Sequence, residues 1–176
     1  CDIQHKFIPL IHDMPRVLEH AQTLVKGCQG LKSIPIIGTE QYPQGLGKLV
    51  DQVNPSQYEV YPKTLFSMYV PSVKDRLKTD LKHVKSVILT GIETHVCILQ
   101  TTLDLLEDGY EVHVVEDAVS SQRLADKVTA IERMRQSGAF ITSTESVLFQ
   151  LVKDAKDPLF KNVSVLMKDH KDRLAK

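Results

Sequence analysis

A cysteine stands in the first helical turn predicted after a buried strand, within residues 91–97, which read GIETHVC. Free amides at a helix N-terminus favour the thiolate and can lower the pKa of a cysteine there below its usual value of about 8.5. The same amides can hold a developing oxyanion. Cys97 is therefore a candidate nucleophile. The alternative is a buried structural cysteine, because free cysteine is among the most buried residue types.

Asp2 and Lys63 are of the types that could assist such a nucleophile. A carboxylate beside a thiol can accept its proton and orient it, provided both groups lie within hydrogen-bonding distance. An ammonium near both groups would stabilise the two anions and keep the cysteine charged. Taken alone, each residue favours a structural interpretation, Asp2 as a loop residue or N-cap and Lys63 as a solvated surface charge.

Apolar strand-like runs alternate with amphipathic helical stretches along the chain. Strands are predicted over residues 34–38, 84–91, 111–116 and 139–142, and helices over residues 14–26, 94–108, 125–136 and from an N-cap at 143–146 through 153. This order is typical of a three-layer αβα fold with a mostly parallel, Rossmann-like sheet of about six strands. Residues 39–62, interrupted by prolines and glycines, are predicted to form a long loop that serves as a lid or substrate wall.

The whole-chain composition narrows the class of protein. With 176 residues, a single domain spanning 1–176 is expected. Lys plus Arg equal Asp plus Glu at 22 each, so the net charge of zero argues against a nucleic-acid partner. The three cysteines form no CxxC pair, which indicates a reducing compartment, and we predict a cytoplasmic location. No apolar run approaches roughly 18 residues, so no membrane partner is expected.

The chain begins with Cys1 rather than Met. We therefore expect its N-terminus to be truncated within or after the first strand. A targeting peptide for an organelle would be lost with the missing residues.

The order of these residues resembles the isochorismatase-like cysteine hydrolases. Three motifs carry the resemblance: D-x-Q at Asp2 and Gln4, K-x-x-aromatic-S at Lys63, Phe66 and Ser67, and G-x-x-T-x-x-C at Gly91, Thr94 and Cys97. Residues 109–118 resemble the next strand of that family. Residues 39–47 and 133–139 are similar to the isochorismatase domain-containing proteins of animals and protozoa.

The resemblance implies a Cys-Asp-Lys triad that hydrolyses a carbon–nitrogen bond in a small amide through a thioester acyl-enzyme. In that scheme Asp2 takes the thiol proton, Cys97 attacks the carbonyl and Lys63 stabilises the anions. A cis peptide bond between Ile92 and Glu93 is also implied, with the Glu93 and Cys97 backbone amides forming the oxyanion hole. The substrate pocket is expected at these residues: Gln4, Phe7, Tyr42, Phe66 and Thr94.

Two departures from the family pattern limit the substrate. Nicotinamidases of the family carry an Asp-x-His and a second histidine that form a metal site, whereas residues 38–43 here read GTEQYP. No metal or other cofactor is therefore expected, and nicotinamide is disfavoured. The enzyme that gives the family its name lacks the cysteine, so Cys97 also argues against isochorismate. A homo-oligomer, either a dimer or a tetramer, is implied by the resemblance.

Two other functions stay open. The chain could be a catalytically weak or non-catalytic protein of the same fold that binds a metabolite or a partner. A nuclease fits less well, because no metal-binding carboxylate cluster or catalytic histidine pair is apparent and the charge is balanced.

Overall fold

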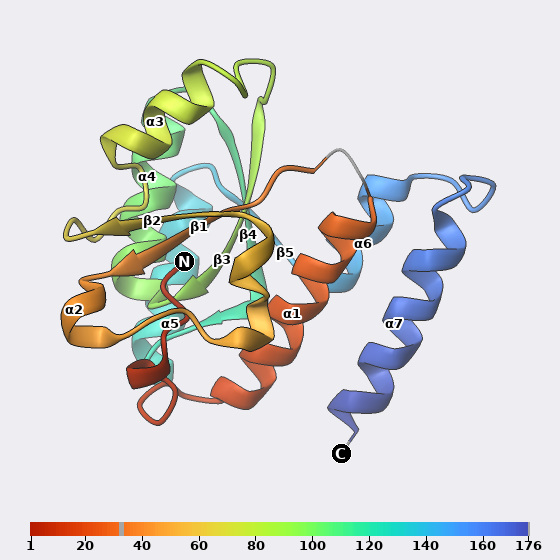
Figure 1. Cartoon of the computed structure of the whole chain (residues 1–176), viewed down its shortest axis with the longest axis horizontal. Coiled ribbons are helices and arrows are strands. Elements are labelled where there is room, and N and C mark those ends of the chain that lie inside the picture. The colour runs from red at the N-terminus through yellow and green to blue at the C-terminus, as the bar shows by residue number, and fades with distance from the viewer. Residues whose placement is uncertain (32–33, 176) are drawn as a thin grey trace.

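The computed structural model describes residues 1–31 and 34–175. Helices cover both faces of a central layer of parallel strands (Figure 1). The strands are β1 (Ile37–Gln41), β2 (Glu59–Lys63), β3 (Ser86–Ile92), β4 (Glu111–Ser120) and β5 (Phe140–Thr142). The α-helices are α1 (Met14–Gly30), α2 (Pro43–Leu46), α3 (Pro71–Lys78), α4 (Leu99–Glu107), α5 (Leu124–Gln136), α6 (Thr144–Val152) and α7 (Phe160–Leu174). The predicted α/β class is confirmed.

Short helical turns complete the chain. Three of them are 3₁₀ turns, at His5–Phe7, Asp51–Val53 and Pro55–Gln57, and a π-helical turn occupies Thr94–Ile98 directly before α4. Among the described residues, no helix combines the length and the apolar character needed to cross a membrane.

The strands form two parallel sheets, one ordered β1-β2 and the other β3-β4-β5, so the prediction of about six strands in one sheet is wrong. The two sheets meet at the N-terminus, which lies between β1 and β3 (Figure 1). There the Asp2 amide donates to the Thr39 carbonyl at 3.2 Å, and the Ile92 amide donates to the Cys1 carbonyl at 3.1 Å. An apolar cavity of about 560 Å³ lies there, lined by residues of both sheets such as Ile37 and Ile88.

The central strand β4 is buried on both faces. Val112 and Val114 belong to the apolar cluster that includes residues of α3, α4 and α5, whereas Val115 and Ala118 belong to the cluster of α1, α6 and α7. All four side chains are 0% exposed. Successive side chains of a strand point to opposite faces, so one β-branched run supplies apolar contacts to both helical layers. The predicted strand is confirmed here, and it extends further, to Ser120.

The predicted end of the first helix and the predicted loop at 39–62 are both wrong, because tertiary packing overrides the local sequence signals. Helix α1 continues through Gly27, where a Cβ atom would lie 2.4 Å from Leu148 Cδ2, so this glycine permits the close approach of α1 to α6 instead of ending the helix. The predicted loop at 39–62 contains α2 and most of β2. Pro62 fits this strand because, among the residues that the structure describes, β2 pairs with β1 alone, and proline is tolerated in edge strands.

Two buried histidines connect α1, α6 and α7. His20 Nδ1 lies 3.1 Å from Thr144 Oγ1 and 3.2 Å from His170 Nε2, and His170 Nδ1 lies 3.0 Å from Thr23 Oγ1. Desolvation lowers the pKa of both imidazoles, and the neighbouring Asp117 carboxylate opposes this effect. The folded chain therefore keeps both rings neutral at pH values where the unfolded chain protonates them.

We expect this histidine pair to weaken the fold at acidic pH. Below the ordinary histidine pKa of about 6.5 the unfolded state binds more protons than the folded state. The free energy of unfolding therefore decreases as the pH is lowered, and it stops decreasing once the pH is below the folded-state pKa. Urea unfolding of the wild type and of a His20→Asn/His170→Asn variant, at pH 7 and pH 5, measures the effect. The variant should lose less stability between the two pH values, and an equal loss would contradict the assignment.

Candidate active site

Three elements bring Asp2, Lys63 and Cys97 together. Asp2 lies in the N-terminal stretch with a φ of +49°, Lys63 is the last residue of β2, and Cys97 lies in the π-helical turn after β3. Ligand sites of open α/β sheets form at the carboxyl ends of parallel strands, where both Lys63 and the π-helical turn are found. Lys63 Nζ lies 2.7 Å from Asp2 Oδ2 and 3.8 Å from Cys97 Sγ.

Lys63 is a buried cation with a full set of acceptors. Its side chain is 0% exposed, so the interpretation as a solvated surface charge is wrong. Besides Asp2, Nζ donates to Gln41 Oε1 at 2.6 Å and to the carbonyl oxygens of Leu65 and Phe66 at 3.1 and 2.8 Å. A buried charge is costly unless it is paired and hydrogen-bonded, and these four oxygens meet that requirement. They also fix the ammonium beside the thiol.

Asp2 is equally buried, at 1% exposure. One carboxylate oxygen, Oδ1, accepts a hydrogen bond from Thr39 Oγ1 at 2.7 Å. The other, Oδ2, accepts from Lys63 and, at 3.3 Å, from the Cys1 thiol. The carboxylate is therefore held in one orientation, and the oxygen that binds Lys63 also accepts the hydrogen bond of the Cys1 thiol.

The surroundings of the Cys97 thiol favour its protonated form. Burial, the largest contribution, and the negative charge of Asp2 raise its pKa, whereas Lys63 and a backbone hydrogen bond from Glu93 lower it, and the net result is a pKa of about 12. The prediction of a thiolate stabilised by a helix N-terminus is thus wrong, because desolvation outweighs these favourable contributions. A nucleophilic role then requires a base that removes the proton during attack, and the Asp2 carboxylate lies within 4.8 Å of the Cys97 sulfur.

The Ile92–Glu93 peptide bond is cis, as expected. The Glu93 carboxylate accepts a hydrogen bond from the Gln122 backbone amide at 2.9 Å, which ties this turn to the segment after β4. The neighbouring Thr94 is 0% exposed, and its hydroxyl has no hydrogen-bond partner within the described chain. The role of the Glu93 and Cys97 amides as an oxyanion hole stays a prediction.

The residues expected to line the substrate pocket fall into different places. Gln4 is 0% exposed, and its amide donates to the carbonyls of Gln41 and Gly47 and accepts from the Gln41 amide. Phe7 packs against the apolar cluster of Ile3 and its neighbours. Tyr42 and Phe66 are 54% and 52% exposed. Gln4 therefore braces the segment after β1, whereas Tyr42 and Phe66 present free aromatic surface.

Three contacts of the site were missed by sequence reasoning. Thr39 orients Asp2, Gln41 binds Lys63, and Cys1 places a second thiol beside the carboxylate. The register of β1 against β2 pairs Gln41 with Lys63, so recognising β2 would have revealed that neighbour. Cys1 adjoins Asp2 in sequence, but adjacency alone does not show which way its side chain points.

Gly91 lets the chain pass close to the N-terminal stretch. Its φ is +120°, and a Cβ atom there would lie 2.1 Å from the Cys1 carbonyl oxygen, which is backbone and cannot swing aside. A glycine at this position therefore sets how near β3 comes to Asp2.

A Gly91→Ala substitution should displace the Cys1–Asp2 backbone and separate Asp2 from Lys63. The clash and the strained φ should together cost at least about 1–3 kcal/mol of unfolding free energy in urea. Gly30→Ala is the matched control, because nothing lies within 4 Å of a Cβ atom there. Equal stability of the two variants would contradict the close approach.

Known proteins are similar to this chain in sequence and in architecture. A model of the isochorismatase domain matches residues 1–146. Isochorismatase family protein 1A of Dictyostelium discoideum is 49% identical, over 99% of this chain and 86% of that protein. Isochorismatase domain-containing protein 2 of Danio rerio is 47% identical, over 95% of this chain and 84% of that protein.

Solved structures agree. The MAR1 ribonuclease of Caenorhabditis elegans superposes with a TM-score of 0.88 and 43% sequence identity, over 94% of this chain and 85% of that chain. The family match covers most of the chain, and the sequence relatives cover nearly all of it. The chain belongs to the isochorismatase family.

Proposed function

We propose that this isochorismatase-family protein is a metal-free cysteine hydrolase that cleaves the carbon–nitrogen bond of a small amide. The observation that carries the proposal is the buried contact of Lys63 Nζ with Asp2 at 2.7 Å and with Cys97 Sγ at 3.8 Å. A nucleophile, a carboxylate base and a cation that holds the base ionised are the groups that this reaction needs.

In the proposed reaction, Asp2 accepts the thiol proton as Cys97 Sγ attacks the amide carbonyl carbon. The backbone amides of Glu93 and Cys97 donate hydrogen bonds to the resulting oxyanion. Collapse of this intermediate breaks the carbon–nitrogen bond, and the leaving nitrogen takes the proton from Asp2. Water then attacks the carbonyl carbon of the thioester and gives a proton to Asp2. The carbon–sulfur bond breaks, the acid is released, and the Cys97 sulfur takes the proton back from Asp2. Throughout, Lys63 stabilises the negative charge that Asp2 must keep in a buried site.

Substrate recognition is proposed to involve the aromatic surfaces of Tyr42 and Phe66. Lys63 Nζ donates a hydrogen bond to the Phe66 carbonyl at 2.8 Å, so the backbone that carries this ring contacts the proposed catalytic cation. Tyr42 follows β1, and its amide donates to the Lys63 carbonyl at 2.8 Å. Both exposed rings thus start from backbone that contacts Lys63, and they could cover an apolar portion of a small amide.

Trapping of the acyl-enzyme tests the proposal. A panel of small primary amides and an activated ester are each mixed with the protein, and rapid acid quenching is followed by mass spectrometry of the peptides. An acyl group on Cys97, absent from Cys97→Ala and present in Cys28→Ala, is the expected result. Cys28 is a suitable control because it is a second buried thiol, whose pKa is raised by desolvation to about 11. Turnover that persists in Cys97→Ala would refute the proposal.

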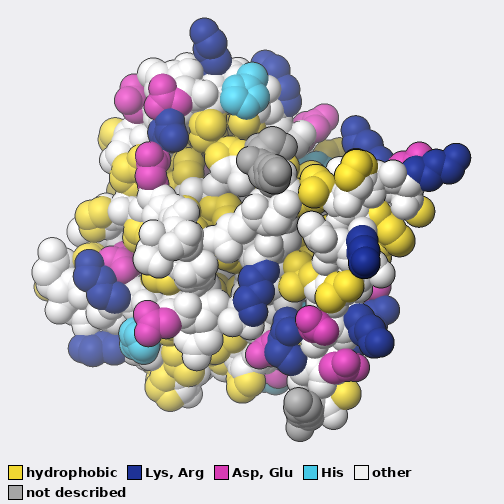
Figure 2. Space-filling view, turned by 45° about the vertical axis from the view of Figure 1, so that its right-hand side comes forward, with side chains coloured by type: hydrophobic (Ala, Val, Ile, Leu, Met, Phe, Trp, Pro, Cys, Tyr) yellow, Lys and Arg dark blue, Asp and Glu magenta, His cyan; other side chains and the backbone are white. Residues whose placement is uncertain are grey.

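Two other functions have distinct outcomes in the same assays. Binding of a panel compound without any acyl adduct or turnover would favour a non-catalytic metabolite-binding or interaction protein. The second alternative is cleavage of RNA, which the name of the C. elegans ribonuclease suggests. Lys and Arg are interspersed with Asp and Glu on the face drawn in Figure 2, and the net charge is zero, which gives a phosphate backbone little attraction. Loss of RNA cleavage in Cys97→Ala would place that activity at this site.

A homo-oligomer is the assembly that we propose. Leu124 and Val128 lie one turn apart on α5 and are 51% and 60% exposed, which leaves apolar surface on the helix that packs against the π-helical turn of Cys97. Apolar side chains grouped in this way are typical of an interface. Sedimentation should show a dimer or tetramer that a Leu124→Glu/Val128→Glu variant shifts to monomer. A wild type that is monomeric at micromolar concentration would contradict the assignment.

A further inference from the structure

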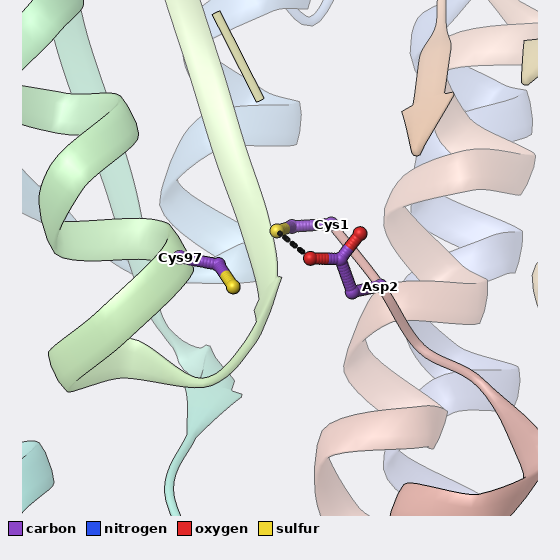
Figure 3. Close-up of side chains that lie close together, drawn as sticks. All are labelled: Cys1, Asp2 and Cys97. Atoms are coloured by element: carbon purple, nitrogen blue, oxygen red, sulfur yellow. Dashed lines mark hydrogen bonds between the residues drawn. The ribbon is translucent and has the colours of Figure 1, made fainter. Parts of the chain in front are cut away.

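A second thiol shares the base of the proposed catalytic cysteine. Cys1 Sγ donates a hydrogen bond to Asp2 Oδ2 at 3.3 Å, and the sulfur atoms of Cys1 and Cys97 and the Asp2 carboxylate all lie within 4.8 Å of one another. Figure 3 shows the Cys1 and Cys97 side chains extending toward each other from the N-terminal stretch and from the turn after β3. The proposed hydrolysis has no step for Cys1, so this nucleophilic group is unexplained.

The charges around the two thiols distinguish between a metal site and a disulfide. Two sulfurs and a carboxylate could ligate a soft divalent cation. However, the Lys63 ammonium lies 2.7 Å from the same carboxylate and 3.8 Å from Cys97 Sγ, and it has no exposed surface through which to withdraw. A cation beside it would be repelled, whereas a neutral disulfide would not. Covalent pairing of the two sulfurs is therefore the better use of this arrangement.

We propose that Cys1 is a resolving cysteine, which forms a reversible disulfide with Cys97 when a peroxide oxidises the site, and thereby switches hydrolysis off while protecting the nucleophile. This regulation rests on the proposed function, because it assumes that Asp2 activates Cys97. The same activation that directs Cys97 toward a carbonyl carbon would direct it toward a peroxide oxygen.

The chemistry is balanced with hydrogen peroxide as the only oxidant. Asp2 accepts the Cys97 proton, the sulfur attacks one peroxide oxygen as the O–O bond breaks, and the leaving oxygen departs as water with that proton, which leaves a sulfenic acid on Cys97. Cys1 then gives its proton to Asp2, and its sulfur bonds to the Cys97 sulfur as the S–O bond breaks. The leaving hydroxide takes the proton from Asp2 and departs as a second water. Each peroxide is reduced by two electrons, which come from the two thiols.

The geometry demands only a local change. The sulfurs must approach from within 4.8 Å to the bonded distance of about 2.05 Å, which requires new side-chain rotamers. Cys1 is half-buried and is one of the residues that line the apolar cavity between the two sheets. Cys28, the third thiol, is buried in α1 and is not part of the cluster around Asp2.

Mass spectrometry after peroxide treatment tests the proposal without any substrate. The wild type should lose two hydrogen atoms, yield a non-reduced peptide that joins Cys1 to Cys97, and leave Cys28 free for alkylation after unfolding. In Cys1→Ser, Cys97 should instead proceed to the sulfinic acid, with a yield at least about tenfold above that of the wild type. Cys28→Ser should behave as the wild type, and Cys1→Ala, if it melts as the wild type does, excludes an effect of the serine hydroxyl.

Activity supplies the second readout. Reduction should restore hydrolysis in the oxidised wild type but not in oxidised Cys1→Ser. Equal sulfinic acid yields in wild type and Cys1→Ser, with no joined peptide, would overturn the redox proposal even if the amide is hydrolysed. A joined peptide in a protein that hydrolyses no amide would instead overturn the proposed function and leave the disulfide established.

Discussion

Replacing Cys97 by alanine should lower kcat/KM for the hydrolysed amide by about 10⁴-fold or more, because the proposed acyl intermediate forms on the Cys97 sulfur. The measurement compares initial rates of wild type, Cys97→Ala and Cys28→Ala at neutral pH. Cys28→Ala should retain wild-type activity, since its thiol lies in α1 and has no contact with Asp2 or Lys63 among those described. The fold of Cys97→Ala should persist, because the change removes a single sulfur atom and leaves the Asp2–Lys63 ion pair intact.

The contrary result is equally informative. A loss of less than tenfold in Cys97→Ala would show that Asp2 activates water directly and that the cysteine is structural. A comparable loss in Cys28→Ala would show that thiol removal acts through packing and not through chemistry.

Removing the charge of Lys63 should be the most destabilising single change at the site. In Lys63→Met, Asp2 keeps its 1% exposure but loses the cation 2.7 Å away. An uncompensated buried charge costs about 3–5 kcal/mol, so the urea midpoint at pH 7 should fall steeply and hydrolysis should cease. Asp2→Asn combined with Lys63→Met should recover part of that stability, because no buried charge then remains unpaired, but it should recover no activity.

A surface ion pair provides the matched control. Lys171 lies 3.0 Å from Glu145, and their side chains are 64% and 46% exposed. Because water screens both charges, Lys171→Met should cost no more than about 1 kcal/mol. If Lys63→Met were as stable as Lys171→Met, Asp2 would be protonated in the folded chain, and its proposed role as the base would fall.

Local sequence was informative wherever a short segment decides its own structure. The β-branched residues of 111–116 predicted a strand, and Ser143 predicted a helix N-cap, which the structure shows as a hydrogen bond from the Ser146 amide to the Ser143 side chain. The motif that ends at Cys97 likewise placed the cysteine in the turn after a strand. Strand β2 was missed because its sequence shows no strand-like alternation of apolar and polar residues. Its extended conformation depends on pairing with β1.

The sequence by itself determined the α/β class, the family, and the candidates Asp2, Lys63 and Cys97, because residue types and their order are local properties. Tertiary structure alone decided that Lys63 is fully buried against Asp2, although the two are far apart in the chain. It also reversed the expected pKa shift of Cys97, since desolvation depends on everything packed around the thiol. It placed the Cys1 sulfur beside that thiol as well, because only the packing of the N-terminal stretch against β3 sets the direction of that side chain.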